Sequence, residues 1–220
     1  LYNTMKITLP DNFSEVTVGQ YKKVWAMYEK EGDAYNAQRR CIELLSGLEP
    51  NSLQDATWES IEQASTTLNW LMKDPDPFTR KMPLVRRFEL RGQQYGFIPD
   101  LSKLTVGEYA DLETMCSGGI FEVLEKVCAI LFREVITEKL DKYEIANYRI
   151  SKERKEAMLD LPMNIAIGAV VFFCNTAKEL ISTTQLYLEN QEEKTKAMQS
   201  IKSGDGTGLS IKWLLGIFSK

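Results

Sequence analysis

The chain has 220 residues, 44% hydrophobic and 26% charged, a composition typical of a globular protein that buries a core without disulfide or metal support. Its 27 basic and 31 acidic residues give a net charge of −4, the opposite of the balance usual in domains that bind nucleic acid through phosphates. It contains no histidine, which excludes Ser-His-Asp and Cys-His catalysis, His-ligated zinc and an imidazole pH switch.

Two segments of similar sequence each predict the start of a helix. Residues 6–21 read KITLPDNFSEVTVGQY, and residues 95–109 read YGFIPDLSKLTVGEY. Both contain a capping box, in which a Thr and a Gln or Glu three residues later each accept a hydrogen bond from the other's backbone N–H. The two boxes are Thr17 with Gln20 and Thr105 with Glu108. The shared Pro-Asp before each box favours a duplicated strand–loop–helix–helix unit, and independent use of a good helix start is the alternative.

Hydrophobic periodicity predicts a short strand and then three helices in the N-terminal part of the chain. Alternating apolar residues favour a strand over Lys6–Leu9. Apolar residues at helical spacing predict helices over Val18–Glu31 and Ala34–Leu45. Asn51-Ser52 offers a cap for a third helix, which ends before the prolines of residues 73–77.

The rest of the chain predicts one hairpin followed by helices. A hairpin is predicted from Val85–Leu90 and Gln94–Ile98, which would form a three-stranded sheet with the N-terminal strand. Helices are predicted over Val106–Met115, Ile120–Ile136, Lys152–Asp160 and Met163–Leu188, with an extended piece at Tyr143–Tyr148. The expected fold class is therefore α+β and predominantly α-helical: a helical bundle with a small antiparallel sheet.

The apolar run Ile165–Cys174 is half the length that a bilayer span needs, so it predicts a core helix. Gly168 and Ala169 in its middle indicate that neighbouring elements approach this helix closely. Four cysteines lie in apolar helical contexts without metal-ligand spacing, which favours buried hydrophobes in a reducing cytoplasm over reactive thiols. They are Cys41, Cys116, Cys128 and Cys174.

Composition divides the chain into four parts. Residues 1–79 carry the strand and first helices, and residues 80–202 carry the hairpin and a helical domain that we expect to pack with 1–79 as one unit. Residues 203–208 form a polar, glycine-rich linker. Residues 209–220 form an apolar C-terminal arm. No signal peptide is recognised at the start of the sequence.

The arm is the first candidate for partner binding. Its large apolar residues are Ile211, Trp213, Leu214, Leu215, Ile217 and Phe218. A free apolar arm favours aggregation, so it folds back on its own domain, docks into a partner's groove or lies on a membrane surface. Only Lys212 and Lys220 accompany these residues, which argues against the membrane.

A basic segment around the hairpin is the second candidate. It contains Arg80, Lys81, Arg86, Arg87 and Arg91, opposed only by Glu89. Such a segment could hold nucleic acid or an acidic protein, or it could be the solvated face of an edge hairpin that resists strand-to-strand aggregation. The acidic net charge favours the solvated face. No catalytic, cofactor-binding or metal-binding residue is predicted.

Several motifs resemble one known family. Residues 95–115 contain IP-x-L-x-x-LT-x-GEY-x-DLE, a later Ile130-Leu131-Phe132-Arg133 precedes Tyr143-Glu144-Ile145, and Leu161-Pro162 leads to a helix carrying GA and FF. This order is similar to a poorly characterised family of tailed-bacteriophage structural-module proteins. The resemblance covers residues 6–30 and 90–185. The resemblance implies that this chain is a virion-assembly protein. It provides no catalytic residues of the family that could be assigned to positions of this sequence.

We therefore expect a non-enzymatic protein that acts through protein–protein contacts, in first place a tail-assembly chaperone in the host cytoplasm. The alternative is a structural neck or tail subunit incorporated in the virion. A further alternative is a nucleic-acid-handling factor that uses the basic segment. The expected partners are tape-measure, tube or neck subunits or a second copy of the chain; nucleic acid and a membrane span are not expected.

Deleting Leu209–Lys220 tests the partner-binding arm. If the arm docks on a partner, the truncated protein keeps its melting temperature but loses its oligomer or its partner, because no core residue has been removed. Thermal denaturation and size-exclusion chromatography with light scattering measure the two effects. A large loss of melting temperature would instead place the arm in the protein's own core.

Overall fold

In the computed structural model of this chain, the described residues are 7–30, 34–72, 82–117, 120–140, 142–149 and 151–176. The chain divides into two compact units, Leu1–Val170 and Val171–Lys220. Residues 163–176 are helical, which confirms the start of the predicted helix over Met163–Leu188. The remainder of that helix, the linker and the C-terminal arm lie outside the described residues.

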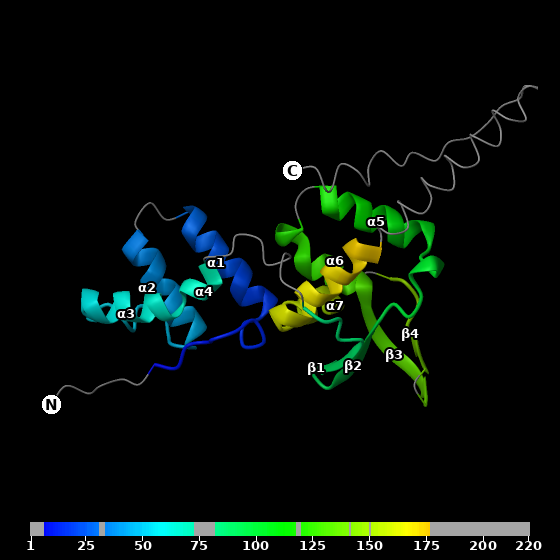
Figure 1. Ribbon diagram of the computed structural model, residues 1–220, viewed down its shortest axis with the longest axis horizontal. Helices are drawn as coiled ribbons and strands as arrows, with labels where there is room; N and C mark the ends of the chain where they lie inside the picture. The colour runs from blue at the N-terminus through cyan, green and yellow to red at the C-terminus, as the bar shows by residue number, and fades with distance from the viewer. Residues whose placement is uncertain are drawn as a thin grey trace, which may run out of the picture. The chain divides into compact units, whose positions relative to one another are not determined.

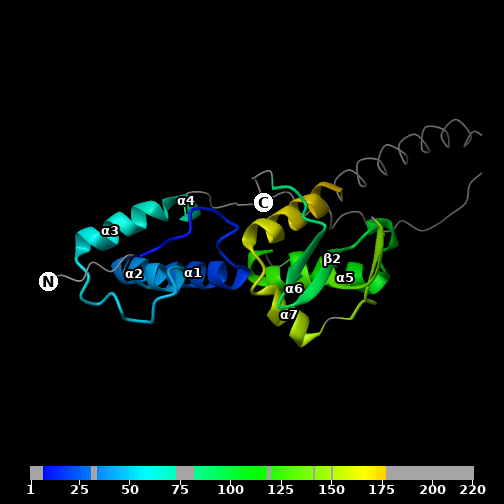
Figure 2. The same cartoon turned by 90° about the horizontal axis from the view of Figure 1, so that it is seen from below.

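Helices form the N-terminal part of the described chain. They are α1 (Val18–Lys30), α2 (Ala34–Leu45), α3 (Trp58–Thr67) and α4 (Asn69–Met72). Figures 1 and 2 both show α2 packed beside α1 and α3. Their buried apolar residues include Val24, Ala37, Cys41, Ile42 and Ile61.

Both predicted capping boxes are confirmed. The Thr17 N–H donates to Gln20 Oε1 at 3.0 Å, and the Gln20 N–H donates to Thr17 Oγ1 at 3.1 Å. The same reciprocal pair joins Thr105 and Glu108, at 2.5 and 3.3 Å. The strand that the duplicated unit should share is missing from the first copy, because residues 7–9 are not in a strand.

The predicted cap of the third helix at Asn51-Ser52 is wrong. Helix α3 begins seven residues after Asn51, and the Thr57 side chain accepts a hydrogen bond from the Ser60 N–H as its N-cap. Asn51 instead lies in a turn with a φ of 68°, and its N–H donates to the buried Glu43 carboxylate at 3.1 Å. Glu43 also accepts from the Leu53 N–H and from Arg39, so a buried ion pair fixes this turn.

The strands form one antiparallel sheet in the order β1-β2-β3-β4. The strands are β1 (Arg87–Leu90), β2 (Gln93–Phe97), β3 (Phe132–Lys139) and β4 (Lys142–Ile145), side by side in Figure 1. The predicted hairpin is confirmed as β1–β2, with Arg91 and Gly92 at positive φ in the two-residue turn that such hairpins favour. The predicted extended piece at residues 143–148 begins as β4.

Two sequence predictions about the sheet are wrong. The strand predicted over Lys6–Leu9 is absent at residues 7–9, and β3 occupies the place beside β2 instead. The helix predicted over Ile120–Ile136 stops at Leu131, where β3 begins at once. The β-branched run Val135-Ile136-Thr137 favours a strand, and pairing of residues 132–134 with β2 and of Val135 and Thr137 with β4 decides between the two conformations.

Helices and short 3-10 turns complete the described fold. They are η2 (Leu101–Lys103), α5 (Val106–Ser117), η3 (Phe121–Val123), α6 (Leu124–Leu131) and α7 (Lys152–Met158). Helices α6 and α7 pack side by side, as Figure 1 shows. The core residues of this part include Phe97, Leu124, Ile130, Leu131, Phe132, Met158, Leu161, Met163 and Ile167.

Backbone hydrogen bonds join the start of α1 to the loop that follows α7. The Val18 N–H donates to the Leu161 carbonyl at 2.9 Å, and the Gly19 N–H donates to the Leu159 carbonyl at 2.7 Å. In return, the Met163 N–H donates to the Val16 carbonyl at 2.9 Å. These bonds satisfy N–H groups that a helix start leaves without intrahelical partners.

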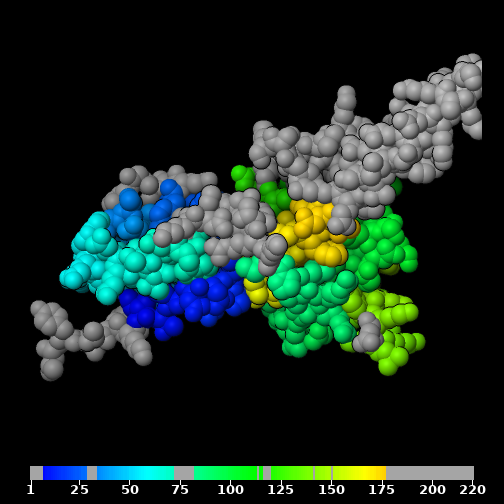
Figure 3. All heavy atoms as spheres, viewed as in Figure 1, coloured from blue at the N-terminus to red at the C-terminus, as the bar shows by residue number. Residues whose placement is uncertain are grey.

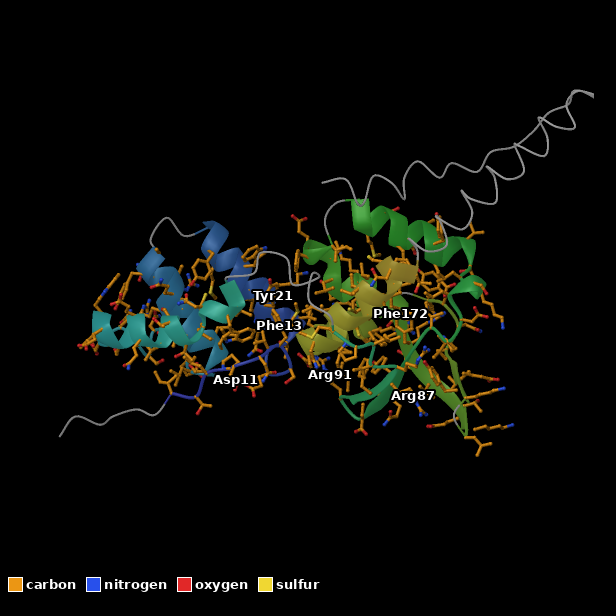
Figure 4. All side chains as sticks on the ribbon, viewed as in Figure 1. Asp11, Phe13, Tyr21, Arg87, Arg91 and Phe172 are labelled. Atoms are coloured by element: carbon orange, nitrogen blue, oxygen red, sulfur yellow. The ribbon has the colours of Figure 1, made fainter. Side chains whose placement is uncertain are left out.

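Aromatic contacts support the same region. The Phe13 ring packs edge-on against Trp70 with centroids 5.1 Å apart and against Tyr21 at 6.2 Å; Figure 4 labels Phe13 and Tyr21. The Trp70 indole N–H donates to the Pro10 carbonyl at 3.1 Å. The N-terminal loop is therefore held by packing and hydrogen bonds without forming a strand.

The expected close approach to the central helix is confirmed at Gly168. A Cβ atom at this position would lie 2.4 Å from the Pro83 carbonyl oxygen, well inside van der Waals contact. Cys41 and Cys128 are buried as expected, while Cys174 is half-buried. Burial, helped by Glu125, raises the pKa of Cys128, so this thiol stays protonated and behaves as a small hydrophobe.

We predict that Gly168→Ala lowers the free energy of unfolding by about 1–3 kcal/mol, because the new methyl group overlaps backbone that has to move. Urea denaturation followed by circular dichroism measures the change. Gly107→Ala in α5 is the matched control, since its Cβ would meet only Tyr148 Cε1, at 3.9 Å. The control should lose no stability, and equal losses in both variants would contradict the packing argument.

Candidate functional site

The sequence-predicted site residues fall in two groups. The arm residues Ile211 to Phe218, together with Arg80 and Lys81, lie outside the described residues. The other members of the basic segment are exposed on and around β1, where Figure 4 marks Arg87 and Arg91; they are Arg86, Arg87 and Arg91. The structure thus places the described cations on an edge strand, as the solvated-face interpretation expects.

Two of these cations are already paired within the chain. Arg87 forms an ion pair with Glu138 of β3, and its guanidinium carbon lies 5.5 Å from the centroid of the Tyr143 ring. Arg91 contacts the Asp160 carboxylate through Nε at 2.7 Å and Nη2 at 2.6 Å. Because nearby carboxylates compensate these charges, the segment is a weaker attractor for phosphate than its sequence indicates.

The structure draws attention instead to the β3–β4 hairpin, which the sequence analysis missed. Strand β3 leaves α6 directly at Phe132, and both Leu131 and Phe132 are completely buried. The Ile98 N–H donates to the Leu131 carbonyl at 3.0 Å, which ties the junction to the end of β2. The base of the hairpin is therefore fixed in the core.

A buried ion pair fixes the base of the hairpin to α5. Arg133 Nη1 lies 2.8 Å from Glu108 Oε1, and both side chains are almost fully buried. Burial lowers the pKa of Arg133, and the Glu108 carboxylate opposes this shift by stabilising the charged guanidinium. Glu108 also closes the capping box of α5, so one carboxylate serves both the helix start and the strand.

The next residue of β3 makes a second ion pair, with α7. Arg154 donates to Glu134 through Nε at 2.9 Å and through Nη2 at 2.5 Å, and its Nη1 donates to the Arg149 carbonyl at 2.8 Å. Burial raises the pKa of Glu134, but the hydrogen bonds and charge of Arg154, a backbone hydrogen bond and the charge of Arg133 together lower it by more, so its pKa lies below the ordinary value of 4.5. A bidentate pair of this kind holds the strand in a defined orientation.

Strand β4 is anchored through Tyr143. Its ring lies against Gly96 of β2 so closely that a Cβ atom there would be 2.4 Å from ring carbon Cε2. The Tyr143 hydroxyl donates to the Phe97 carbonyl at 2.6 Å. Beyond β4, the Tyr148 hydroxyl donates to Asp111 of α5, so the chain leaving the hairpin is also tied down.

The far end of the hairpin is exposed and carries two apolar side chains and two lysines. We call Ile136, Lys139, Leu140 and Lys142 the hairpin tip; Ile136 is 64% exposed and Leu140 95% exposed. Figure 3 shows the yellow-green surface of the hairpin open to solvent on the face in view. Leu140 has a φ of 54°, a left-handed conformation that bulky side chains rarely adopt. Lys139 and Lys142 are opposite each other in the strand register.

A second exposed apolar group lies on α3. Trp58 is 60% exposed and stacks on Tyr35 of α2, with ring centroids 4.9 Å apart and planes inclined by 20°. The carboxylates around it are exposed, and residues 51–72 contain no Lys or Arg. We call Asp55, Trp58, Glu59 and Glu62 the Trp58 surface.

An open hollow of about 640 Å³ lies where α1 faces the β1–β2 turn and the end of α7. Its lining includes Lys22, Lys23, Arg91 and Asp160. Lys22 pairs with Glu125 and Arg91 pairs with Asp160, so most of its charge is used in internal contacts. Among the described residues, no group of three or more Cys, Asp and Glu is arranged to hold a metal ion. No described helix is long and apolar enough to cross a membrane.

Comparison with protein-family models, with curated proteins and with solved structures found no match. The hairpin tip and the Trp58 surface are therefore identified as candidate sites from the geometry of this chain alone. A signal for the hairpin was present in the sequence: Val135-Ile136-Thr137 is a β-branched run, and Lys142–Ile145 alternates between polar and apolar residues. The sequence analysis missed this hairpin because it predicted a helix through Ile136.

We predict that Glu134→Gln lowers the free energy of unfolding by about 1–3 kcal/mol at neutral pH, because Arg154 loses its charged partner while buried. Because folding lowers the pKa of Glu134, the Glu134 carboxylate stabilises the folded state at pH values above its ordinary pKa of 4.5. This contribution to the free energy of unfolding is lost as the pH falls below that value. Glu134→Gln should therefore show a smaller loss of stability on acidification than the wild type.

Glu138→Gln is the matched control, because Glu138 lies in the same strand but its ion pair with Arg87 is exposed. Urea denaturation at a series of pH values compares the three proteins. The control should change by less than about 1 kcal/mol, as expected for a surface pair. Equal acid sensitivity of the wild type and Glu134→Gln would contradict the assigned role of Glu134.

Proposed function

We propose that this chain is a non-enzymatic bacteriophage virion-assembly protein that acts through protein–protein contacts, in first place as a tail-assembly chaperone. The observation that carries the proposal is the exposure of apolar side chains on rigid supports, above all at the hairpin tip. A chaperone of this kind covers an apolar segment of a tape-measure or tube protein until assembly.

The contacts that hold β3 and β4 in place favour a binding role for the hairpin tip over a role as a flexible loop. Strand β3 is held by the Arg133–Glu108 and Arg154–Glu134 ion pairs, and β4 is held by Tyr143. A preorganised surface loses less conformational entropy on binding, so more of the contact energy becomes affinity. Exposed apolar residues on such a support are typical of interaction sites.

The motifs shared with the phage structural-module family lie on this framework. The segment IPDLSKLTVGEYADLE, residues 98–113, begins directly after β2 and contains the Thr105 capping box and most of α5. Its Glu108 holds Arg133 at the base of the hairpin. These motif residues therefore act in the fold by positioning the hairpin, which links the family resemblance to the proposed contact surface.

Coexpression with the tape-measure and tail-tube proteins of the phage that encodes the chain tests the proposal. We expect the chain to keep one of them soluble and to copurify with it, because an apolar segment of the partner is covered. Leu140→Asp should reduce copurification by about tenfold or more, since it places a charge in the contact. Val106→Asp, at an exposed apolar position in the first turn of α5, is the control and should copurify like the wild type.

Mass spectrometry of purified phage particles separates the chaperone from the structural subunit. A chaperone is absent from the particle, whereas a neck or tail subunit is present at a fixed multiple. Presence at a fixed multiple would replace the chaperone role with the structural one. Failure to bind any virion protein, together with absence from the particle, would contradict the assembly function itself.

A further inference from the structure

We infer that two copies of this chain dimerise edge to edge, with strand β4 of one copy pairing antiparallel to strand β4 of the other about a two-fold axis at Tyr143. The two four-stranded sheets then join into one. The inference goes beyond the proposed function, because it rests on the backbone and the charges of β4 and on no virion protein.

Strand β4 is an open edge of the sheet. It pairs with β3 on one side and stands last in the strand order, at the end of the sheet in Figure 1. The Ala146 N–H donates to the Glu134 carbonyl of β3 at 2.8 Å, so position 146 directs its backbone groups into the sheet. These directions alternate along an antiparallel strand, so Tyr143 and Ile145 direct their N–H and C=O groups outward. Among the described residues, none bonds to these outward groups.

The side chains of β4 leave this edge accessible. The Tyr143 ring leans away from the edge, across β3, and lies against Gly96 of β2. Its hydroxyl is held there by the Phe97 carbonyl. Lys142 and Glu144 are exposed on the opposite face of the strand. An accessible row of unpaired backbone groups is a template for a strand of another chain.

The charges of β4 select a second copy of the same strand as that partner. With the two-fold axis at Tyr143, Lys142 lies directly opposite Glu144 of the second copy, and Glu144 lies opposite its Lys142. Within one chain these two residues are two positions apart, about 7 Å along the strand. Directly opposite residues have their Cβ atoms about 5 Å apart, where opposite charges are stabilising. No ion pair joins Lys142 or Glu144 to another described residue.

The same charges also select one register. Hydrogen bonding requires that outward-directed residues pair with each other, so the register can shift only by two residues at a time. A shift in one direction places Lys142 opposite Lys142 of the second copy, and a shift in the other direction places Glu144 opposite its Glu144. Both shifts bring like charges together. Asp141, which lies outside the described residues, falls opposite the uncharged Ile145 in the selected register and opposes no charge.

The other edge of the sheet differs from β4 in this respect. Strand β1 carries the same spacing of opposite charges in Arg87 and Glu89. However, Arg87 is paired with Glu138 of β3, and Glu89 accepts a hydrogen bond from Gln94 at 3.2 Å. The charges of β1 are therefore engaged within the chain, which favours β4 as the dimer edge.

The contact is isologous, so each copy uses its only β4 edge and assembly stops at a dimer. Two strands of four residues bury less than the roughly 1,200 Å² of a standard interface, so we expect a weak dimer. Its dissociation constant should be on the order of 0.1 mM.

Sedimentation velocity of the full chain, at concentrations up to about 1 mM, tests the inference. We expect the average mass to rise from that of one chain towards that of two and no further. Lys142→Glu should weaken the dimer at least about tenfold, because both pairs across the axis become pairs of like charge. It should keep its melting temperature, since the new carboxylate faces Lys139 of its own chain. Lys139→Glu is the matched control: it makes the same charge change one strand further from the contact and should weaken the dimer about threefold or less.

A charge exchange tests the register. Glu144→Lys alone should weaken the dimer as Lys142→Glu does. The double variant Lys142→Glu with Glu144→Lys restores opposite charges at both pairs and should dimerise like the wild type. An equimolar mixture of the two single variants should form a heterodimer, because each then meets the opposite charge.

Three results would overturn the inference. The wild type could remain a monomer at every concentration, in which case β4 is a short charged edge that resists pairing. The mass could grow beyond a dimer, or the double variant could stay monomeric while the wild type dimerises. In each case copurification with a tape-measure or tube protein is measured separately, so failure of the inference and failure of the proposed function are distinguishable.

Discussion

The direct passage from α6 into β3 is the constraint on which the described structure depends. Leu131 and Phe132 are both completely buried, and each contributes on the order of 1.5–3 kcal/mol of burial energy. No loop separates helix from strand, so the packing of α6 sets the direction of β3. Everything attached to β3, including β2 through the Ile98–Leu131 hydrogen bond and the whole β4 hairpin, takes its position from this junction.

The two residues that follow Phe132 fix the orientation of the exposed part of β3 relative to the core. Arg133 and Glu134 are neighbours on β3, yet one pairs with α5 and the other with α7, as the alternation of a strand requires. Replacing such pairs by apolar residues is often neutral for stability, so their contribution here is orientation. They hold the strand from both sides at its base while its tip extends into solvent.

Local signals in the sequence predicted the fold well where the structure is decided locally. Both capping boxes and the β1–β2 turn depend on residues within four positions of each other, and all three are confirmed. The strand at residues 7–9 and the helix through Ile136 failed because distant partners decide them. Phe132 pairs with Phe97, thirty-five positions earlier, and no periodicity within either segment contains that information. Arg86, Arg87 and Arg91 of the basic segment lie on and around an edge strand, but the pairing of Arg87 with Glu138 and of Arg91 with Asp160 depends on the same distant contacts.

The exposure of Trp58 and Leu140 was also not predictable from the local sequence pattern. Trp58 fits the apolar stripe of α3 by composition, yet Ile61 occupies the buried position and Trp58 stacks outward on Tyr35. Leu140 sits in a turn where stability alone would select Asn or Gly. Leu140 carries a conformational cost in the isolated chain, whereas Trp58 offsets part of its exposure by stacking on Tyr35. A cost fixed in place by a rigid framework is best explained by contact with another surface, because a flexible tip could relieve it without a partner.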